Sequence, residues 1–294
     1  MSTWVRPRLT GGSQIAKVMP GDPGWSWTGL EVIELAPGAQ RSVETGGLEY
    51  IVLPLSGAAQ VTVAGVTHSL AGRPDVFSGP SDMVYVGRDN SFTLTSPAGG
   101  RFALAAAVAA TSRPTCYLAT ADVPVELRGA GQASRQVRNF GTPGVLEADS
   151  IIACEVITPA GNWSSYPPHK HDQERPGLET QLEEIYYFEL QAEAGATAGE
   201  PIGYQRVYGT TERPIEVLAE VRSGDVVLIP HGWHGPAMAP PGYDMYYLNV
   251  MAGPGEERAW LICDDPAHAW VRQTWQTQKV DPRIAPTPST TREE

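Results

Sequence analysis

The apolar residues of this chain gather in short runs that turn residues separate. The runs EYIVLPLSG (49–57), IIACEVITP (151–159) and EEIYYFEL (183–190) are rich in β-branched and aromatic residues. Further runs of the same kind are AAQVTVAG (58–65), DMVYVG (82–87), SFTLTS (91–96), DVVLIP (225–230) and DMYYLNVMAG (244–253). Such runs, bounded by glycine and proline at short intervals, are typical of strands in a sandwich or barrel. The pattern therefore predicts an all-β fold.

The two halves of the chain show a similar order of apolar and turn-rich segments. In the first half, the run at 48–57 is followed by AGRPDVFSGPSDMVYVGRDNSFTL (71–94). In the second half, the run at 183–190 is followed by RSGDVVLIPHGWHGPAM (222–238). Each half has an acidic residue that opens an apolar strand and turn-rich segments around a second pair of strands. We interpret the chain as two related β-barrels with a boundary near 141–150, and chance likeness between β-rich halves is the alternative.

This interpretation divides the chain into three parts. We expect an N-terminal barrel over 1–145, a C-terminal barrel over 146–270 and an extended C-terminal tail over 271–294. Helical periodicity is scarce, and AHAWVRQTWQ (267–276) is the best short-helix candidate. The chain then ends in VDPRIAPTPSTTREE, which is polar and rich in proline and threonine.

Length and charge narrow the classes of function. The chain has 294 residues, which is enough for two domains of about 150 residues each or for one large all-β unit. Hydrophobic residues make up 41% of it, so it can bury a sizeable core. The 21 lysines and arginines against 33 acids give a net charge of −12, which argues against a nucleic-acid partner because phosphate binding needs a basic face. Local arginines still permit a small anionic substrate.

The three cysteines and the apolar runs indicate the cellular compartment of the protein. Cys116, Cys154 and Cys263 are odd in number and far apart, so they form neither a disulfide framework nor a paired zinc motif. The N-terminus MSTWVRPRLT lacks an apolar signal core, and the run FALAAAVAA (102–110) is too short to cross a bilayer. We therefore expect a cytoplasmic protein with no membrane partner.

Two of the six histidines lie one residue apart, in NWSSYPPHKHDQE. If this stretch is extended, side chains alternate, so His169 and His171 face one side and Lys170 faces the other. Two neutral imidazoles that converge on one point bind a divalent transition metal well. The alternative is a pair of surface histidines near a turn.

Two residues farther along the chain favour a metal site over a pair of surface histidines. Glu184 opens the strand at EIYYF, and His234 lies in the glycine- and proline-rich GDVVLIPHGWHGP. Three imidazoles and one carboxylate leave one or two positions open on a five- or six-coordinate ion, as catalysis requires. Zinc is the metal we expect first, with manganese and iron as alternatives.

The order His-x-His, Glu, Gly-x5-Pro-x-Gly-x-His resembles the two motifs of the cupin family, in which small β-barrels hold a metal with three histidines and one glutamate. The chain departs from the common pattern in two places. The gap from His171 to Glu184 is longer, and PHGWH (230–234) is one residue shorter between its glycine and its histidine.

With these departures, the chain resembles one particular family of cupins. YPPHKHD, LEEIYYF, HGWHGPAMAPPGYDMYYLNVMAG and the following Arg258–Trp260 resemble the 5-deoxy-glucuronate isomerase family of bacterial inositol catabolism, which is related to the 4-deoxy-hexosulose-uronate isomerases. The resemblance covers about residues 20–270. It implies a tandem cupin (bicupin) of two double-stranded β-helix, or jelly-roll, barrels, in which only the second barrel holds the metal. The first half agrees, because it contains a single histidine, His68.

The ligand assignments have neighbours as alternatives. Glu183 and Glu184 are adjacent, so only one points inward in an extended strand. We expect Glu184, which matches the family pattern, with Glu183 and Glu179 as alternatives. We expect His234 rather than His231, because His234 follows the Gly-Trp step where the family has its ligand.

Four further residues are candidates for catalysis and substrate binding. Tyr186 projects the same way as Glu184, and Tyr247 and Asn249 share a face of one strand. We expect Tyr186 and Tyr247 to be catalytic and Asn249 to bind substrate, whereas packing residues with a polar tip are the alternative. Arg206 is expected to bind a substrate carboxylate through its guanidinium fork, and an exposed strand cation is the alternative.

The resemblance implies conversion of 5-deoxy-D-glucuronate to 5-dehydro-2-deoxy-D-gluconate, an aldose–ketose isomerisation by an enediol or a hydride shift. The small-molecule partner is then a sugar acid. Alternatives are an isomerase of a pectin-derived 4-deoxy-hexosulose-uronate, a metal-dependent cupin dioxygenase and a non-enzymatic sugar-binding cupin. Barrels of this kind commonly pair through edge strands, so we expect a homo-oligomer.

Overall fold

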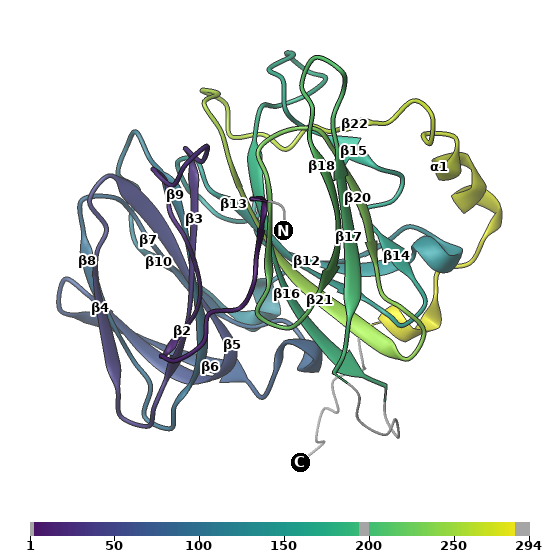
Figure 1. The fold of residues 1–294 in the computed structure, drawn as a ribbon. Helices are drawn as coiled ribbons and strands as arrows, with labels where there is room; N and C mark the ends of the chain where they lie inside the picture. The colour runs from purple at the N-terminus through teal and green to yellow at the C-terminus, as the bar shows by residue number, and fades with distance from the viewer. Residues whose placement is uncertain (1–2, 194–199, 286–294) are drawn as a thin grey trace.

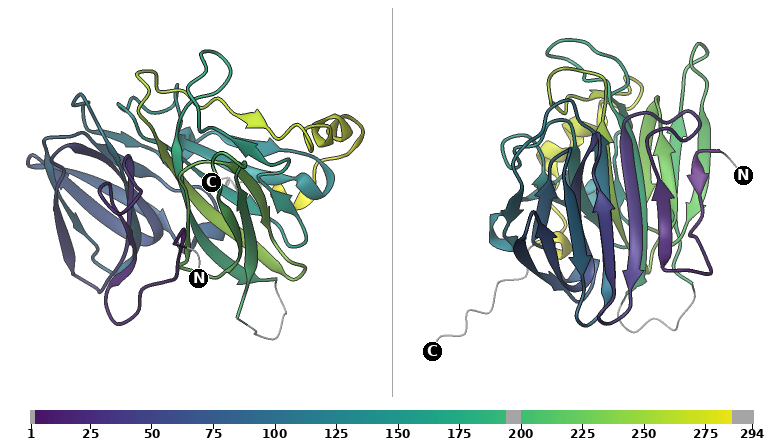
Figure 2. Two further views of the ribbon diagram at one scale, coloured as in Figure 1. Left: turned by 45° about the horizontal axis from the view of Figure 1, so that its top comes forward. Right: turned by 90° about the vertical axis from the view of Figure 1, so that its left-hand side faces the viewer.

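Two β-barrels lie side by side in the computed structural model, which describes residues 3–193 and 200–285 (Figure 1). The two further views in Figure 2 show the same arrangement, with one face of each barrel packed against the other. The predicted all-β class with two barrels in tandem is confirmed.

The N-terminal barrel is built from antiparallel strands in the order β10-β7-β5-β9-β3-β2, while β4, β6 and β8 pair around the far part of the long strand β5. The strands are β2 (Gln14–Val18), β3 (Thr28–Leu35), β4 (Gln40–Glu44), β5 (Leu48–Val63), β6 (Val66–Arg73), β7 (Met83–Val86), β8 (Ser91–Thr95), β9 (Gly100–Val108) and β10 (Cys116–Leu118).

The C-terminal barrel has two sheets. The first has the order β1-β19-β16-β21-β13-β12-β11, and the second has the order β18-β17-β20-β15-β22 with β14 also paired to β20. The first sheet contains β1 (Val5–Arg6), β11 (Val125–Arg128), β12 (Arg135–Gly141), β13 (Ile152–Thr158), β16 (Glu183–Ala192), β19 (Val226–Ile229) and β21 (Tyr243–Ala252). The second contains β14 (Trp163–Ser164), β15 (His169–Lys170), β17 (Gly203–Tyr208), β18 (Glu216–Val221), β20 (Trp233–Met238) and β22 (Cys263–Asp264).

Strands from the first 145 residues take part in the C-terminal barrel. β12 pairs with β13, β11 pairs with β12, and β1 pairs with β19. The division of the chain at residue 145 stays a prediction, and the sheet of the second barrel extends across it.

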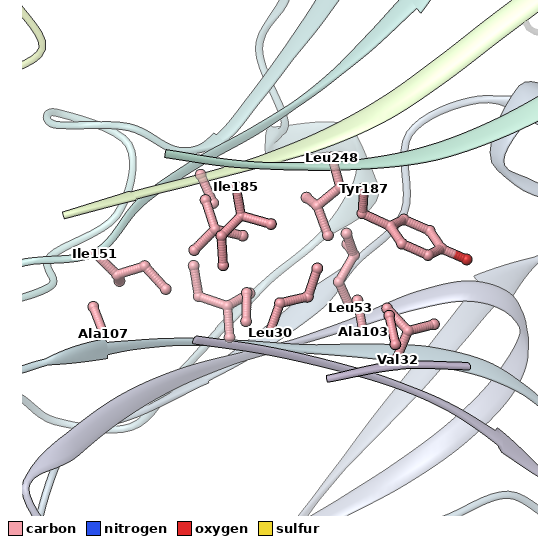
Figure 3. Packing of buried hydrophobic residues seen from close by; sticks show 14 of the residues in the cluster. Leu30, Val32, Leu53, Ala103, Ala107, Ile151, Ile185, Tyr187 and Leu248 are labelled. Atoms are coloured by element: carbon pink, nitrogen blue, oxygen red, sulfur yellow. The ribbon is translucent and has the colours of Figure 1, made fainter. Parts of the chain in front are cut away.

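Alternation along the strands separates two apolar layers. Ile185 and Tyr187 of β16 belong to the cluster that fills the space between the barrels, together with Leu30 and Leu53 (Figure 3). Tyr186, by contrast, belongs to the cluster inside the C-terminal barrel. Because successive side chains of a strand point to opposite faces, the even-numbered residues of β16 point into the second barrel.

Buried acids also connect the two barrels. Glu155 of β13 pairs with Arg73 of β6 and accepts a hydrogen bond from the Tyr246 hydroxyl at 2.7 Å. Glu183 of β16 accepts hydrogen bonds from the backbone N–H groups of residues 26–28. Charged groups are buried only where partners satisfy them, so both contacts fix the barrels in one relative position.

Helical structure is brief. The helix α1 (Val271–Thr274) lies inside the segment predicted to be helical and continues into η4 (Trp275–Thr277). The other short helices are η1 (Val76–Ser78), η2 (Thr120–Asp122), η3 (Gly131–Ala133) and η5 (Pro282–Ile284). The predicted extended tail begins with α1, η4 and η5, and its residues 286–294 lie outside the described part. Within the described ranges, no helix has the length and apolarity needed to cross a bilayer.

Candidate metal centre

Three of the four predicted ligands converge inside the C-terminal barrel. Glu184 comes from β16, His234 from β20, and His171 follows β15. Nε2 of His171 and Nε2 of His234 each lie 3.1 Å from Oε2 of Glu184. One ligand atom of each residue lies within 4.8 Å of the others, and all three side chains are buried. Together they form a compact set of two nitrogens and one oxygen.

The fourth predicted ligand, His169, lies beside this group. His169 pairs directly with His234 across β15 and β20, and their ring centroids are 4.5 Å apart. The ring centroids of His169 and His171 are 6.3 Å apart. The structure therefore brings all four predicted ligands to one place, whereas their coordination of an ion stays a prediction.

A close approach of two backbone segments holds this arrangement. Gly235 follows His234 and has a φ of +100°, and a Cβ at this position would collide with the carbonyl oxygen of Ser165. Only glycine allows that approach at a positive φ. The segment that leads into β15 can therefore lie directly against β20.

The hydrogen bonds of the histidines fit a metal site. Each Nδ1 faces a backbone carbonyl oxygen: His169 that of Pro167 at 3.4 Å, His171 that of Leu182 at 3.1 Å, and His234 that of Gly232 at 3.3 Å. A carbonyl oxygen only accepts, so Nδ1 carries the proton in the neutral ring and Nε2 keeps its lone pair. This is the orientation that metal-binding histidines adopt.

Burial and charge act together on these side chains. Burial is the main cause that lowers the pKa of His169, and the neighbouring rings of His234 and His171 lower it further. For His171, burial is outweighed by the contact with Glu184, which raises its pKa. Nε2 of His234 lies close to Glu184 but makes no hydrogen bond of acceptable geometry within the described residues. A buried lone pair beside a carboxylate fits a divalent cation.

A second ring of polar contacts fixes the ligand-bearing segments. Oε1 of Glu179, which is fully buried, accepts hydrogen bonds from the backbone N–H of Asp172 at 2.9 Å and from Nζ of Lys170 at 2.7 Å. Oδ2 of Asp172 accepts one from the backbone N–H of Gly232 at 2.9 Å. The segment after His171 is thus tied to the segment before His234.

Replacement of Glu179 by glutamine tests this support. We expect Glu179→Gln to keep the metal stoichiometry but to weaken metal affinity by about 10- to 100-fold, the range observed when outer partners of metal ligands are removed. Titration with a competing chelator measures the affinity. If Glu179→Gln abolished metal binding as completely as His171→Ala, Glu179 would be a ligand and not a support.

The alternative ligands lie elsewhere. The carboxylate of Glu183 contacts the backbone of residues 26–28, and that of Glu179 contacts Lys170 and Arg175. Nδ1 of His231 is buried without a hydrogen bond among the described residues, and its electrostatic neighbours are Arg213 and Asp172. None of these three belongs to the cluster that the described residues form.

The two predicted catalytic tyrosines meet beside the metal centre. Their rings are 4.8 Å apart, and the ring centroids of Tyr186 and His234 are 6.2 Å apart. The hydroxyl of Ser165 lies 2.9 Å from that of Tyr186 and 3.2 Å from that of Tyr247. Burial raises the pKa of Tyr186 well above its usual range and that of Tyr247 to about 12. Sequence reasoning missed Ser165, although its position directly before the YPPHKHD motif was a signal.

The two predicted substrate-binding residues have different surroundings. Asn249 is buried opposite Tyr186 on β21, and its Nδ2 has no hydrogen-bond partner in the described residues. Arg206 of β17 is exposed, and its guanidinium lies over the ring of Tyr208 at 4.3 Å. The next residue, Val207, packs inside the barrel, so Arg206 lies on the outer face. The structure thus brings Asn249, but not Arg206, to the metal centre.

Comparisons with known proteins show which family this chain is similar to. The model of the KduI/IolB family matches residues 4–271. A protein of Geobacillus kaustophilus (strain HTA426) named 5-deoxy-glucuronate isomerase is 40% identical over 262 residues, which cover 88% of this chain and 91% of that protein.

Solved structures share the fold. An IolB-like protein from Salmonella typhimurium LT2 superposes with a TM-score of 0.84 at 31% identity, covering 92% of this chain and 99% of that chain. An oxalate decarboxylase from Lactobacillus farciminis superposes with a TM-score of 0.62 at 12% identity, covering 90% and 89% of the two chains. At that identity the likeness concerns the fold alone.

Proposed function

Because the chain belongs to the KduI/IolB family, we propose that it is an aldose–ketose isomerase of inositol catabolism that converts 5-deoxy-D-glucuronate to 5-dehydro-2-deoxy-D-gluconate. The match confirms the family resemblance inferred from the sequence. One observation carries the proposal: the buried group of His171, Glu184 and His234 lies next to two tyrosines whose hydroxyls share a serine.

The metal of this site would be held by His169, His171, Glu184 and His234. Imidazole nitrogens with one carboxylate suit zinc, which we favour, and also manganese and iron. When bound, the ion supplies Lewis acidity that polarises a carbonyl and stabilises the negative charge that develops on its oxygen.

The side chains around the ligands handle protons and position the sugar. The hydroxyls of Tyr186 and Tyr247 meet at Oγ of Ser165, so a proton given to a substrate oxygen by one phenol is replaced through the serine. Nδ2 of Asn249 is buried without a partner among the described residues, which supports a role in binding a substrate oxygen.

A direct test measures turnover of synthetic 5-deoxy-D-glucuronate, with metal analysis before and after chelation. We expect about one divalent ion per C-terminal barrel, loss of turnover on chelation and recovery on metal addition. Oxygen uptake and a pectin-derived uronate are assayed in parallel. Turnover of the pectin-derived acid alone, or oxygen uptake, would overturn the proposal.

The same assay in deuterated water separates the two routes of hydrogen transfer. Proton transfer through an enediol exchanges the migrating hydrogen with the solvent, so deuterium enters the product at carbon. A hydride shift keeps the original hydrogen. If the product kept a deuterium label from the migrating position of the substrate, transfer through a base that exchanges its proton with the solvent would be excluded.

Removal of one phenol hydroxyl tests the role of the tyrosines. We expect Tyr186→Phe to lower kcat by about 100-fold with metal content unchanged, at the low end of the range for general acid–base catalysis because Tyr247 remains. Steady-state kinetics and metal analysis of the same preparation check this result. An unchanged kcat would leave Tyr186 with a packing role only.

Two further assignments belong to this proposal. We place the protein in the cytoplasm, because its three cysteines are free thiols, as expected in a reducing compartment. We also propose a homo-oligomer formed through edge strands, which light scattering of the purified protein tests.

A further inference from the structure

Arg135 is a buried cation that forms no ion pair within the part of the chain that the structure describes. It is the first residue of β12 and only 5% exposed. Within the described residues, its only side-chain hydrogen bond runs from Nη1 to the carbonyl oxygen of Ala133 at 2.9 Å, and no acid lies within ion-pair distance. A buried guanidinium without an acid is costly, so such a group is retained where a ligand supplies the missing charge.

The neighbouring arginines do have acids. Arg128 lies directly opposite Arg135 on β11 and pairs with Glu126 at 2.6 Å. Arg272 shares the ring of Trp275 with Arg135 and pairs with Asp264. Like charges opposite one another on paired strands repel, which adds to the need for an anion at Arg135.

Arg135 points into the C-terminal barrel. It shares a face of β12 with Val137, which packs in the cluster inside the C-terminal barrel. Val137 pairs with Val156, and Val156 pairs with Tyr247. The positive charge of Arg135 reaches Tyr247: burial is the main influence on the pKa of Tyr247 and raises it, while Arg135 lowers it.

A pocket lies beside the guanidinium. It has a volume of about 400 Å³, and Ala133, Trp275 and Tyr166 are among the residues that line it. Ala133 accepts the hydrogen bond of Arg135, and the ring of Trp275 lies 5.5 Å from its guanidinium carbon. Tyr166 directly follows Ser165, which bonds to both tyrosines. Neither Arg135 nor the proposed ligands line the pocket themselves, so Arg135 lies behind Ala133 and Trp275, the two lining residues that it contacts.

We propose that Arg135 binds the carboxylate of the sugar acid, with Nε and Nη2 as the free donors of its fork. A planar guanidinium matches a carboxylate with two parallel hydrogen bonds. The inference rests on the proposed function, because it assigns one end of that substrate to this arginine and the carbonyl end to the metal centre. Arg206, exposed on the outer face, is the competing assignment.

The test compares Arg135→Met and Arg135→Lys with the matched control Arg206→Met. Two ligands are used: 5-deoxy-D-glucuronate, and its neutral analogue with a hydroxymethyl group in place of the carboxylate. We expect Arg135→Met to lower kcat/KM for the acid by about 100-fold, mostly through KM, as for other buried charge partners. In Arg135→Met, turnover of the neutral analogue, bound metal and the melting curve stay as in the wild type. For Arg206→Met, kcat/KM for the acid stays within about twofold of the wild-type value.

A binding measurement keeps the two proposals apart. The borohydride-reduced acid keeps the carboxylate but cannot isomerise, so calorimetry of its binding to metal-free wild type and Arg135→Met reports on the arginine without turnover. If the wild type failed to turn over the uronate, the proposed function would fail while this measurement still tested the arginine.

The outcomes for the arginine are distinct. Unchanged affinity of Arg135→Met for the reduced acid, or a loss confined to Arg206→Met, overturns the inference. Should Arg135→Met not fold, Arg135→Lys decides, because lysine keeps the charge but lacks the bidentate fork: about tenfold weaker binding supports the inference, and unchanged binding overturns it.

Discussion

Glu184→Gln is expected to release the metal and to lower turnover by at least about 1000-fold, because Lewis acidity is worth several kcal/mol of transition-state stabilisation. Glutamine has the same shape as glutamate, so the packing of β16 is kept and only the charge is lost. Glu184 is buried and lies 3.1 Å from the ring nitrogens of both His171 and His234. Without the carboxylate, only the three imidazoles of His169, His171 and His234 remain to hold the ion.

The adjacent residue supplies the control. Glu183 points to the other face of β16, where its carboxylate accepts hydrogen bonds from backbone N–H groups of residues 26–28 in the N-terminal barrel. We expect Glu183→Gln to keep metal and turnover but to lower the free energy of unfolding by roughly 2 kcal/mol, as expected for charge-assisted hydrogen bonds.

Metal analysis, steady-state kinetics and denaturant unfolding of both variants check this pair of predictions. We expect Glu184→Gln to lose metal and turnover, whereas Glu183→Gln keeps both and loses stability. Loss of metal in Glu183→Gln, with metal retained in Glu184→Gln, would move the carboxylate ligand by one residue and reverse the face of β16 that carries the site.

Glu155→Gln is expected to lower the free energy of unfolding by about 3–5 kcal/mol, the range for breaking a buried ion pair from one side. Glu155 is 1% exposed and pairs with Arg73 of the N-terminal barrel, whose guanidinium is also buried. A second arginine, Arg138, lies 3.9 Å from its other oxygen. Loss of the carboxylate leaves two buried cations without an acid.

A surface pair provides the comparison. Glu220 pairs with Arg222 at 2.7 Å, and both side chains are 40% exposed. Removal of this carboxylate in Glu220→Gln should change stability by less than about 1 kcal/mol, because water screens exposed pairs. Equilibrium unfolding in urea measures both variants. A loss below 1 kcal/mol for Glu155→Gln would mean that the ion pair does not hold the barrels together.

The local sequence pattern predicted much of the candidate site. Alternation along EIYYF placed Glu184 and Tyr186 on one face and Glu183 on the other, and the structure has this arrangement. The ligand order predicted that His169, His171 and His234 meet. These inferences succeeded because the faces of a strand and the spacing within a motif depend on residues that are close in sequence.

Contacts between distant segments could not be predicted in the same way. Nothing near Glu183 in the sequence indicates that it accepts hydrogen bonds from residues 26–28, and nothing near Arg206 indicates which face of β17 is outside. The same holds for Arg135, whose segment GAGQASRQV contains no recognised motif.

By itself, then, the sequence determined many of the strands, the residues of β16 that share a face, the candidate metal-binding residues and the family. Tertiary structure alone decided that β1, β11 and β12 join the sheet of the second barrel, that Arg135 is buried and that Arg206 is exposed. The physical reason is that strand pairing joins backbones far apart in the chain, and alternation specifies a face without specifying the neighbour that covers it.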